Sequence, residues 1–377
     1  MTISWGLSSS VARPTRRAGH SLALDGLRGL AVLAVVAFHT GVLPFGWLGV
    51  PVFFVLSGHF ITRILLERRT GNRSTDLGNF LRNRALRLAP LYLLACVALT
   101  VLAVVKHGPK NLAGDLPFLW TWTYDFRPVT AGYVDNNLYD HLWSLGVEVQ
   151  LYLVWAALAL LLPRRWFTRV LVALAVGGPV VRVLVWLAMV GFGPDQRVIA
   201  TYELPTTYLD AFAIGALTAL PEVRARLPRP ARVVWVVAGL TAVICVVELV
   251  GVLRREGPIT GNLHFPIAFP RQLAWIWGYS LIAALTGAIV LVALGGSRPL
   301  SWRPLAWVGL ISYGVYVGHR PVLELGKRLL PGEPSMVLLA GLAVAVVLVS
   351  LGLAAVSYRW FERPFMSRKR NALSTTA

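Results

Sequence analysis

Three ionisable residues lie in the first long apolar stretch of the chain, which runs from Leu24 to His39. They are Asp25, Arg28 and His39 itself. Arg28 and His39 are eleven residues apart, so on a helix they are separated by about 1100°, which places them on one face and roughly 16 Å apart. Charged groups are costly in hydrocarbon, so this face must line a protein interior or a watery cavity. Histidine exchanges protons near neutral pH, so such a face could form a proton or substrate path.

Further polar residues follow in and between the next apolar segments. Ser57 and Gly58 are typical of close helix packing, whereas His59 is either an internally satisfied histidine or a pocket residue. Arg84 and Arg87 are three residues apart and would share one helical face. On their own they fit the positive charge of a cytoplasmic loop. The alternative is an anion clamp for phosphates, to which paired guanidinium groups are well suited.

Polar groups also occur in the later apolar segments. Glu148 lies about a turn and a half into a predicted helix, so we expect it to face a polar cavity or a cationic partner. Tyr313 and His319 lie near one end of a later segment, where such residues are common at the membrane interface as well as in pockets. Asp210 and Glu248 are also carboxylates in apolar segments, but fewer polar residues surround them to indicate a cavity.

The composition is that of a membrane protein. Of the 377 residues, 56% are hydrophobic and 14% are charged, and the mean hydropathy is +0.65. Soluble domains carry about 25% charged residues. The net charge of +19 comes mainly from Lys and Arg in short loops, where they set topology and meet anionic lipid, so no nucleic acid partner is expected. Cys96 and Cys245 lie in apolar segments, and no Cys/His cluster predicts a disulfide framework or a metal site.

The apolar segments predict an all-α polytopic membrane protein of about ten transmembrane helices. The predicted spans cover residues 24–43, 47–67, 87–105, 143–162, 169–190, 206–220, 233–253, 272–294, 305–323 and 336–357.

The distribution of basic residues predicts that both termini are cytoplasmic. With that orientation most of the 36 Lys and Arg residues fall on the inner side. Residues 1–20 are expected to form a disordered cytoplasmic tail, 21–366 the transmembrane domain and 367–377 a basic cytoplasmic tail. The longest outer loop, about 106–142, is rich in Trp and Tyr. These rings are expected to form an interfacial belt, with a sugar-stacking surface as the alternative.

Taken together and in order, these motifs resemble the membrane acyltransferase-3 family, over roughly residues 22–366. The spacing of Arg28 and His39 matches the family's Arg-X10-His motif. The other matching segments are Leu24–Gly29, Phe53–Gly58, the Arg84/Arg87 pair, Trp143–Leu145 with Glu148, Ser312 to His319, and Glu362–Pro364. His59 departs from the family, whose members often have Phe or Tyr there. No hydrolase-like domain of the SGNH type follows the last predicted helix, so the resemblance is to the stand-alone members.

The resemblance implies a multi-pass protein of the bacterial plasma membrane that O-acylates a carbohydrate, a cell-envelope glycan or a macrolide-type acceptor. The implied donor is acyl-CoA, most simply acetyl-CoA, as a co-substrate, with no tightly bound cofactor. It further implies that His39 is catalytic with Arg28 as its motif partner, and that Arg84 and Arg87 bind the donor's phosphates. Glu148 is a candidate to orient the imidazole or hold the acceptor.

Sequence reasoning leaves three alternatives for the chemistry. His39 could act as general base in direct transfer or carry the acyl group as an acyl-histidine. A transporter or channel could use Asp25, Arg28 and His39 as a proton or substrate path. A non-catalytic partner could only deliver acyl groups across the bilayer. Asp25, His59, Tyr313 and His319 are expected as pocket residues, and the oligomeric state is left open.

Overall fold

The computed structural model describes residues 21–67, 69–107, 114–131, 138–226, 230–255, 274–330, 332 and 334–368. Both predicted tails therefore lie outside the described residues, except Ser367 and Arg368. Within the described residues the structure is helical and contains no strand. The α-helices are α1 (Leu22–His39), α2 (Gly49–Glu67), α3 (Arg73–His107), α4 (Leu116–Trp120), α5 (Arg127–Ala131), α6 (Trp143–Leu161), α7 (Arg164–Ala188), α8 (Pro194–Glu203), α9 (Leu209–Ala219), α10 (Pro221–Arg226), α11 (Pro230–Arg255), α12 (Ala274–Leu294), α13 (Arg303–Leu310), α14 (Ser312–Lys327), α15 (Met336–Ser357) and α16 (Arg363–Ser367).

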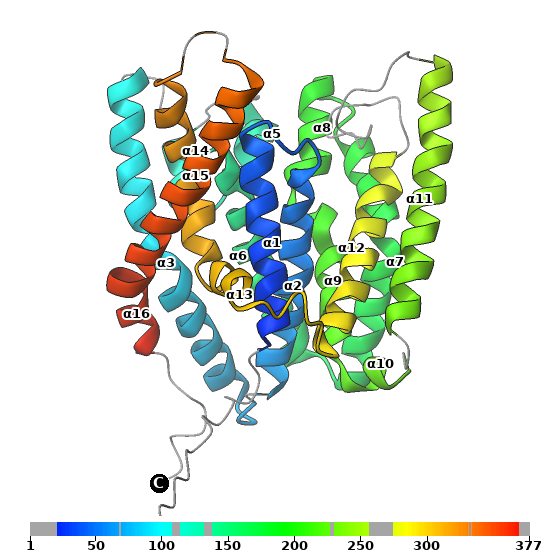
Figure 1. Cartoon of the computed structure of the whole chain (residues 1–377). Coiled ribbons are helices and arrows are strands. Elements are labelled where there is room, and N and C mark those ends of the chain that lie inside the picture. Colours follow the sequence, from blue (N-terminus) through cyan, green and yellow to red (C-terminus); the bar gives the residue numbers. More distant parts are fainter. Residues whose placement is uncertain are drawn as a thin grey trace, which may run out of the picture.

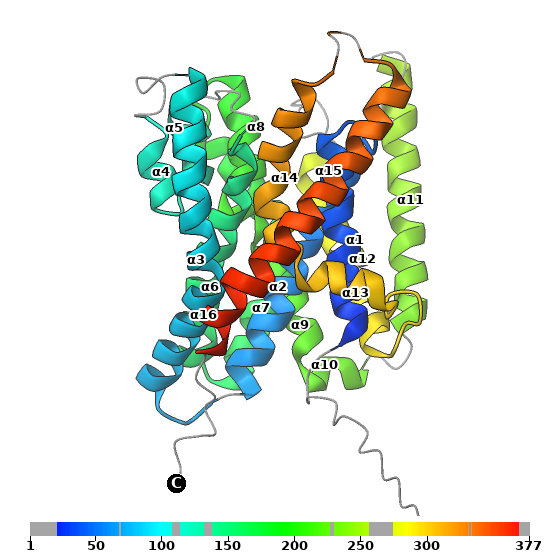
Figure 2. The same ribbon diagram turned by 60° about the vertical axis from the view of Figure 1, so that its left-hand side comes forward.

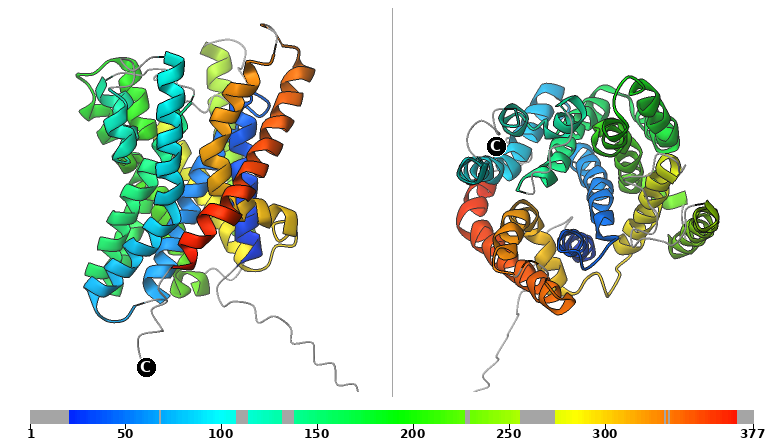
Figure 3. Two further views of the ribbon diagram at one scale, coloured as in Figure 1. Left: turned by 90° about the vertical axis from the view of Figure 1, so that its left-hand side faces the viewer. Right: turned by 90° about the horizontal axis from the view of Figure 1, so that it is seen from above.

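The long helices run side by side between two ends of the molecule (Figures 1 and 2). Viewed from above, α1 and α2 lie inward of the surrounding helices, and α11 lies outermost (Figure 3). The start of α1, the end of α2, the starts of α3 and α7, and α10 all lie at the same end as α16 (Figure 1). We call this the basic end, because these segments carry Arg63, Arg73, Arg164, Arg165, Arg224, Arg226, Arg363 and Arg368.

Seven of the described helical segments are long and apolar enough to cross a membrane by length and composition. They are Leu22–His39, Gly46–Glu67, Arg73–Val105, Asp140–Leu161, Arg164–Ala188, Trp275–Leu294 and Val337–Ser367.

The other three predicted spans are also helical, and two of them differ from simple membrane helices. The segment 206–220 forms α9, of only 11 residues, which ends where Leu220 turns extended before Pro221. The segment 233–253 lies within α11, where Glu248's side chain is outside the described residues. The segment 305–323 is broken at Ile311 into α13 and α14. The prediction was about ten transmembrane helices; within the described residues seven segments have the length and apolarity of a membrane span, so the predicted number is matched only in part.

The crossing of α1 and α13 explains the glycines of the first motif. A Cβ atom on Gly29 would collide with the carbonyl oxygen of Leu305, and one on Gly309 would collide with that of Asp25. Backbone therefore packs directly on backbone, which only glycine permits at such a distance. With one face of α1 held against α13, the neighbouring face that carries Arg28 is turned towards the interior of the molecule.

A buried ion pair joins α7, α9 and α12. Arg182 of α7 lies 2.6 Å from the Asp210 carboxylate of α9, and both side chains are at most 1% exposed. The Arg182 guanidinium also donates to Ser280 Oγ of α12 and to the carbonyl oxygen of Thr207. Both terminal nitrogens of Arg182 are hydrogen-bonded to neighbouring segments and the carboxylate has its cation, so burial of the pair inside the bundle is tolerated. The sequence did not explain Asp210. In the structure it links α9 to α7 and α12.

The segment between α3 and α6 folds back onto the helices at the end opposite the basic end. Trp122 stacks on Tyr92 of α3 with ring centroids 3.5 Å apart, and Tyr139 is fully buried. Asp115 accepts hydrogen bonds from Arg127 and from the Tyr139 hydroxyl, both at 2.6 Å. The described aromatic residues of this segment therefore form a packed cap, whereas the prediction was an interfacial belt; among those described only Trp120 is strongly exposed, and Tyr133 lies outside the described residues.

Candidate functional site

A cavity of about 410 Å³ lies between α1, α2, α3, α6 and α14. Its lining includes six of the predicted site residues: Asp25, Arg28, Arg84, Arg87, Glu148 and Tyr313. The lining residues of α2 run from Val50 to Glu67, which is about 26 Å along a helix axis. The cavity therefore extends from the basic end through most of the thickness of a bilayer.

The basic part of the cavity is built from three helices. Arg28 comes from α1, Arg63 from α2, and Arg84 and Arg87 from one face of α3. Arg63 is paired with Glu67 at 2.8 Å. The Arg28 guanidinium lies 5.9 Å from the centroid of the Phe60 ring. Convergent guanidinium groups in a partly buried cavity form an environment suited to phosphate oxygens.

Helix α3 begins at Arg73, fourteen residues before the predicted span. The Arg84/Arg87 pair therefore lies within a continuous helix and not in a loop at the membrane surface. Because these two residues point into the cavity, their placement goes beyond the general excess of positive charge at the cytoplasmic side.

Glu148 occupies the middle of the cavity. Its Oε1 atom accepts hydrogen bonds from the hydroxyl groups of Ser57 on α2 and Tyr152 on α6. These contacts fix the carboxylate and direct it towards the cavity, as predicted for an acidic residue in this span. Its partners are two hydroxyl groups and not an imidazole, so Glu148 does not orient His39 in this structure.

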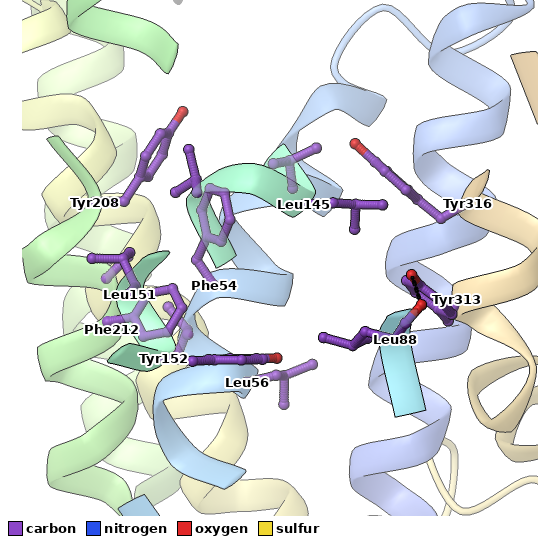
Figure 4. Close-up of a cluster of buried hydrophobic side chains, with 14 of the residues drawn as sticks. Phe54, Leu56, Leu88, Leu145, Leu151, Tyr152, Tyr208, Phe212, Tyr313 and Tyr316 are labelled. Carbon is purple, nitrogen blue, oxygen red and sulfur yellow. Dashed lines mark hydrogen bonds between the residues drawn. The ribbon is translucent and has the colours of Figure 1, made fainter. Parts of the chain in front are cut away.

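The far end of the cavity is formed by Tyr316, which the sequence did not single out. Figure 4 shows Tyr313 and Tyr316 on one side and Phe54, Leu56 and Tyr152 on the other. The Tyr316 hydroxyl donates to the carbonyl oxygen of His141 at 2.9 Å and lies 2.6 Å from Ser144 Oγ.

Tyr313, one turn earlier on α14, donates its hydroxyl proton to the carbonyl oxygen of Leu88 on α3 at 2.9 Å. The sequence feature that could have identified Tyr316 is the spacing of three residues from Tyr313 to Tyr316 and again from Tyr316 to His319. It puts all three side chains on neighbouring positions of one helical face.

His39 lies just beyond this end of the cavity and does not line it. Its Nδ1 atom is 3.0 Å from the carbonyl oxygen of Val35 and 3.0 Å from Nε2 of His319. The ring of His319 is fully buried between those of His39 and His141, with ring centroids 4.9 Å from each. The structure thus pairs two predicted residues, His39 and His319, and adds His141 to them.

His59 lies outside the cavity. It is buried at the contact between α2 and α9, where its Nδ1 atom is 2.8 Å from Thr218 Oγ1. The structure therefore places His59 inside the helix bundle and not in the cavity, with Nδ1 bonded to Thr218 and Nε2 buried without a hydrogen-bond partner among the described residues.

Asp125 supports the site from outside the membrane spans. Its carboxylate is fully buried and accepts a hydrogen bond from Gln150 of α6 at 2.8 Å. Burial raises the pKa of Asp125 to about 7, although the hydrogen bond from Gln150 opposes this shift. Gly146, on the same face of α6, lies against Asp125 and Trp122. These contacts therefore fix the start of α6, which carries Ser144 and Glu148, against the segment between α3 and α6.

Among the described residues, no group of three or more His, Cys, Asp or Glu side chains has the arrangement of a metal site. Of the three histidines on α1, η4 (Asp140–Leu142) and α14, His39 and His319 are hydrogen-bonded, whereas His141 contacts His319 through its ring and bonds the backbone of Val317.

Comparison with known proteins shows which family the chain belongs to. A family model described as an acyltransferase domain matches residues 21–355. The chain is 29% identical over 366 residues to the peptidoglycan O-acetyltransferase OatA of Listeria monocytogenes, covering 90% of this chain and 55% of that protein. It is 26% identical over 368 residues to the O-acetyltransferase OatA of Staphylococcus aureus, covering 92% of this chain and 57% of that protein.

The chain thus spans little more than half the length of these relatives. No solved structure matches it. The matching region contains the cavity, the Arg28/His39 pair and the histidine cluster, and it carries all seven candidate spans at least in part. The chain is therefore a multi-pass membrane protein that belongs to the acyltransferase-3 family.

Proposed function

We propose that this chain transfers an acyl group, most simply acetyl, from acyl-CoA to a hydroxyl group of a cell-envelope glycan. The observation that carries the proposal is the polarity of the cavity: guanidinium groups gather at the basic end, and the His39/His319 pair adjoins the other end. The basic end is assigned to the cytoplasm by the positive-inside rule. A cytoplasmic donor would therefore meet the arginines first.

The donor would enter with its phosphates at Arg84 and Arg87 and its acyl end directed towards Tyr316. Arg28, in the basic part of the cavity and roughly 16 Å below His39 along α1, would hold the donor and not stabilise the reacting carbonyl. The ring of Tyr316 lies between the cavity and the histidines, so transfer requires this ring to turn aside.

In the reaction itself the acceptor hydroxyl attacks the thioester carbonyl. His39 takes the hydroxyl proton as the new C–O bond forms, and the C–S bond then breaks to leave a thiolate, which receives the proton. A positioned base contributes about 10²–10⁴-fold in rate, and alignment of the two substrates adds to this. In direct attack His39 acts only as the base. In an acyl-histidine route His39 would first be the nucleophile and then the leaving group.

The glycan acceptor is supported by the relatives, of which the Listeria protein is named as a peptidoglycan O-acetyltransferase. A glycan outside the membrane would reach His39 from the end opposite the basic end, where this side chain is only half-buried. None of the relatives named above is a transporter or a channel, so nothing favours the transport alternative.

The test uses the purified full chain in lipid nanodiscs with radiolabelled acetyl-CoA. Acceptors are peptidoglycan-derived oligosaccharides and, as a second class, a macrolide with free hydroxyl groups. The proposal predicts label on the oligosaccharide with one free CoA released per acetyl group. Acetyl-CoA-dependent label on neither acceptor, or acetyl-CoA consumption without any acylated acceptor, would contradict it.

A further inference from the structure

The hydrogen bonds around His319 fix where its proton lies. Its Nδ1 atom is 2.6 Å from the carbonyl oxygen of Tyr316. A carbonyl oxygen can only accept, so Nδ1 carries the proton and donates it. In the neutral ring the other nitrogen, Nε2, then has a free lone pair. This atom is the one that lies 3.0 Å from His39.

The same reasoning fixes the proton on His39. Its Nδ1 atom faces two acceptors, the carbonyl oxygen of Val35 and Nε2 of His319, each at 3.0 Å. Nδ1 of His39 must therefore be the donor, shared between the two. Its Nε2 atom is left without a proton, and no other described residue hydrogen-bonds it. An imidazole nitrogen in this state is the form that accepts a proton from a hydroxyl.

We infer that His319 is a positioning residue for the transfer reaction: it fixes the Nδ1–H tautomer of His39 and stabilises the imidazolium that forms when Nε2 takes the acceptor's proton. This inference rests on the proposed function, because it assigns His39 as the base. Orientation of a catalytic histidine through its second nitrogen usually falls to a carboxylate. Here a neutral imidazole does so, which avoids burying a negative charge in the membrane.

The surroundings keep His319 in place for this role. The ring is fully buried, and α14 anchors it through the Tyr316 carbonyl one turn earlier. His141, on its other side, has Nε2 3.3 Å from the carbonyl oxygen of Val317 and so donates to backbone. His141 therefore packs against His319 but does not compete for its Nε2 lone pair.

The experiment compares variants of the full chain in nanodiscs, with steady-state kinetics for acetyl-CoA. His319→Leu removes the acceptor without enlarging the side chain, and His319→Gln supplies an amide oxygen that can accept from His39. We expect His319→Leu to lower kcat at least tenfold with an unchanged KM for acetyl-CoA, and His319→Gln to recover part of the loss. Wild-type kcat in His319→Leu, or a change confined to KM, would overturn the inference.

His141→Leu is the matched control, since it removes a ring at the same distance from His319 that does not bond His39. It should lower kcat less than His319→Leu; an equal loss would indicate packing alone and overturn the inference. Nitrogen-15 NMR of histidine-labelled wild-type protein, with His39→Gln to assign the signal, gives a readout that does not depend on variant folding. A proton on Nδ1 of His39 supports the inference, and a proton on Nε2 overturns it.

These results separate the inference from the proposed function. If His39→Gln abolishes transfer while His319→Leu is fully active, the function stands and the inference fails. If His39→Gln keeps full activity, the proposed base itself fails, whatever the variants of His319 do.

Discussion

Arg28 and His39 lie on one helix and on one face, yet only Arg28 lines the cavity. His39 lies beyond the far end of the cavity and contacts His319. The ring of Tyr316 lies between the cavity and these two histidines. The two residues of the motif therefore serve different parts of one path. In the proposed reaction Arg28 acts on the donor inside the cavity, and His39 acts where donor and acceptor meet.

The first prediction concerns the donor's phosphates. Arg84→Ala and Arg87→Ala should each raise the KM for acetyl-CoA by about 10- to 100-fold, since a hydrogen bond to a charged group contributes about 1.5–3 kcal/mol. Acetyl-pantetheine lacks the nucleotide phosphates, so its KM should not change. Arg82→Ala is the control, because Arg82 is exposed on the same helix and outside the cavity. Equal effects on both donors would contradict a phosphate contact.

The second prediction concerns the α1–α13 crossing. Gly309→Ala should destabilise the protein by about 1–3 kcal/mol, because the new methyl group has to displace the backbone of Asp25. Acyl transfer should fall with it, since Arg28 lies on the displaced helix. Gly352→Ala on α15 is the matched control, with open space around the new Cβ atom. Thermal unfolding in detergent measures both variants, and equal melting temperatures would refute the proposed crossing contact.

A third prediction tests the Arg182–Asp210 pair. Arg182→Met leaves the Asp210 carboxylate buried without its cation, which should cost about 3–5 kcal/mol of stability. Replacing Asp210 as well, in Arg182→Met/Asp210→Asn, should restore part of this loss because the uncompensated charge is removed. Arg169→Met, on the same helix with a solvent-facing guanidinium, serves as the control. Additive losses in the double variant would show that the two residues do not act as a pair.

The fourth prediction is a pH dependence of stability from Asp125. Its pKa is raised to about 7 in the folded protein, so ionising it there costs more than in the unfolded chain. The stability it contributes is fully present below pH about 4 and is lost as the pH rises through about 7. Asp125→Asn cannot ionise and should lack this loss. Melting temperatures of both proteins from pH 4 to 8 give the comparison, and parallel curves would disprove the assignment.

Much of the site could be predicted from sequence because membrane segments tolerate few polar residues. Asp25, Arg28 and Glu148 stand out in apolar segments, and all three line the cavity. Tyr316 did not stand out, since tyrosine near a membrane interface is common for other reasons. Its role depends on how α14 meets α6, a contact between residues 172 positions apart.

The fold shows the same limit. Helical segments were predictable from apolar length, but the break at Ile311 was not, because the apolar pattern continues through it. The position of His59 also depends on a tertiary contact: its partner Thr218 lies 159 residues away on α9. Hydropathy reports which residues leave water, whereas helix packing decides which of them face one another.

The most direct test of the central claim is the rate of acetyl transfer by His39→Ala, measured by CoA release and acceptor labelling in nanodiscs. His59→Ala is the matched control, since it removes a membrane histidine outside the cavity. We predict that His39→Ala folds, binds acetyl-CoA with unchanged affinity and loses about 10²–10⁴-fold in kcat, while His59→Ala keeps its activity. Full acetyl transfer by folded His39→Ala would contradict the account.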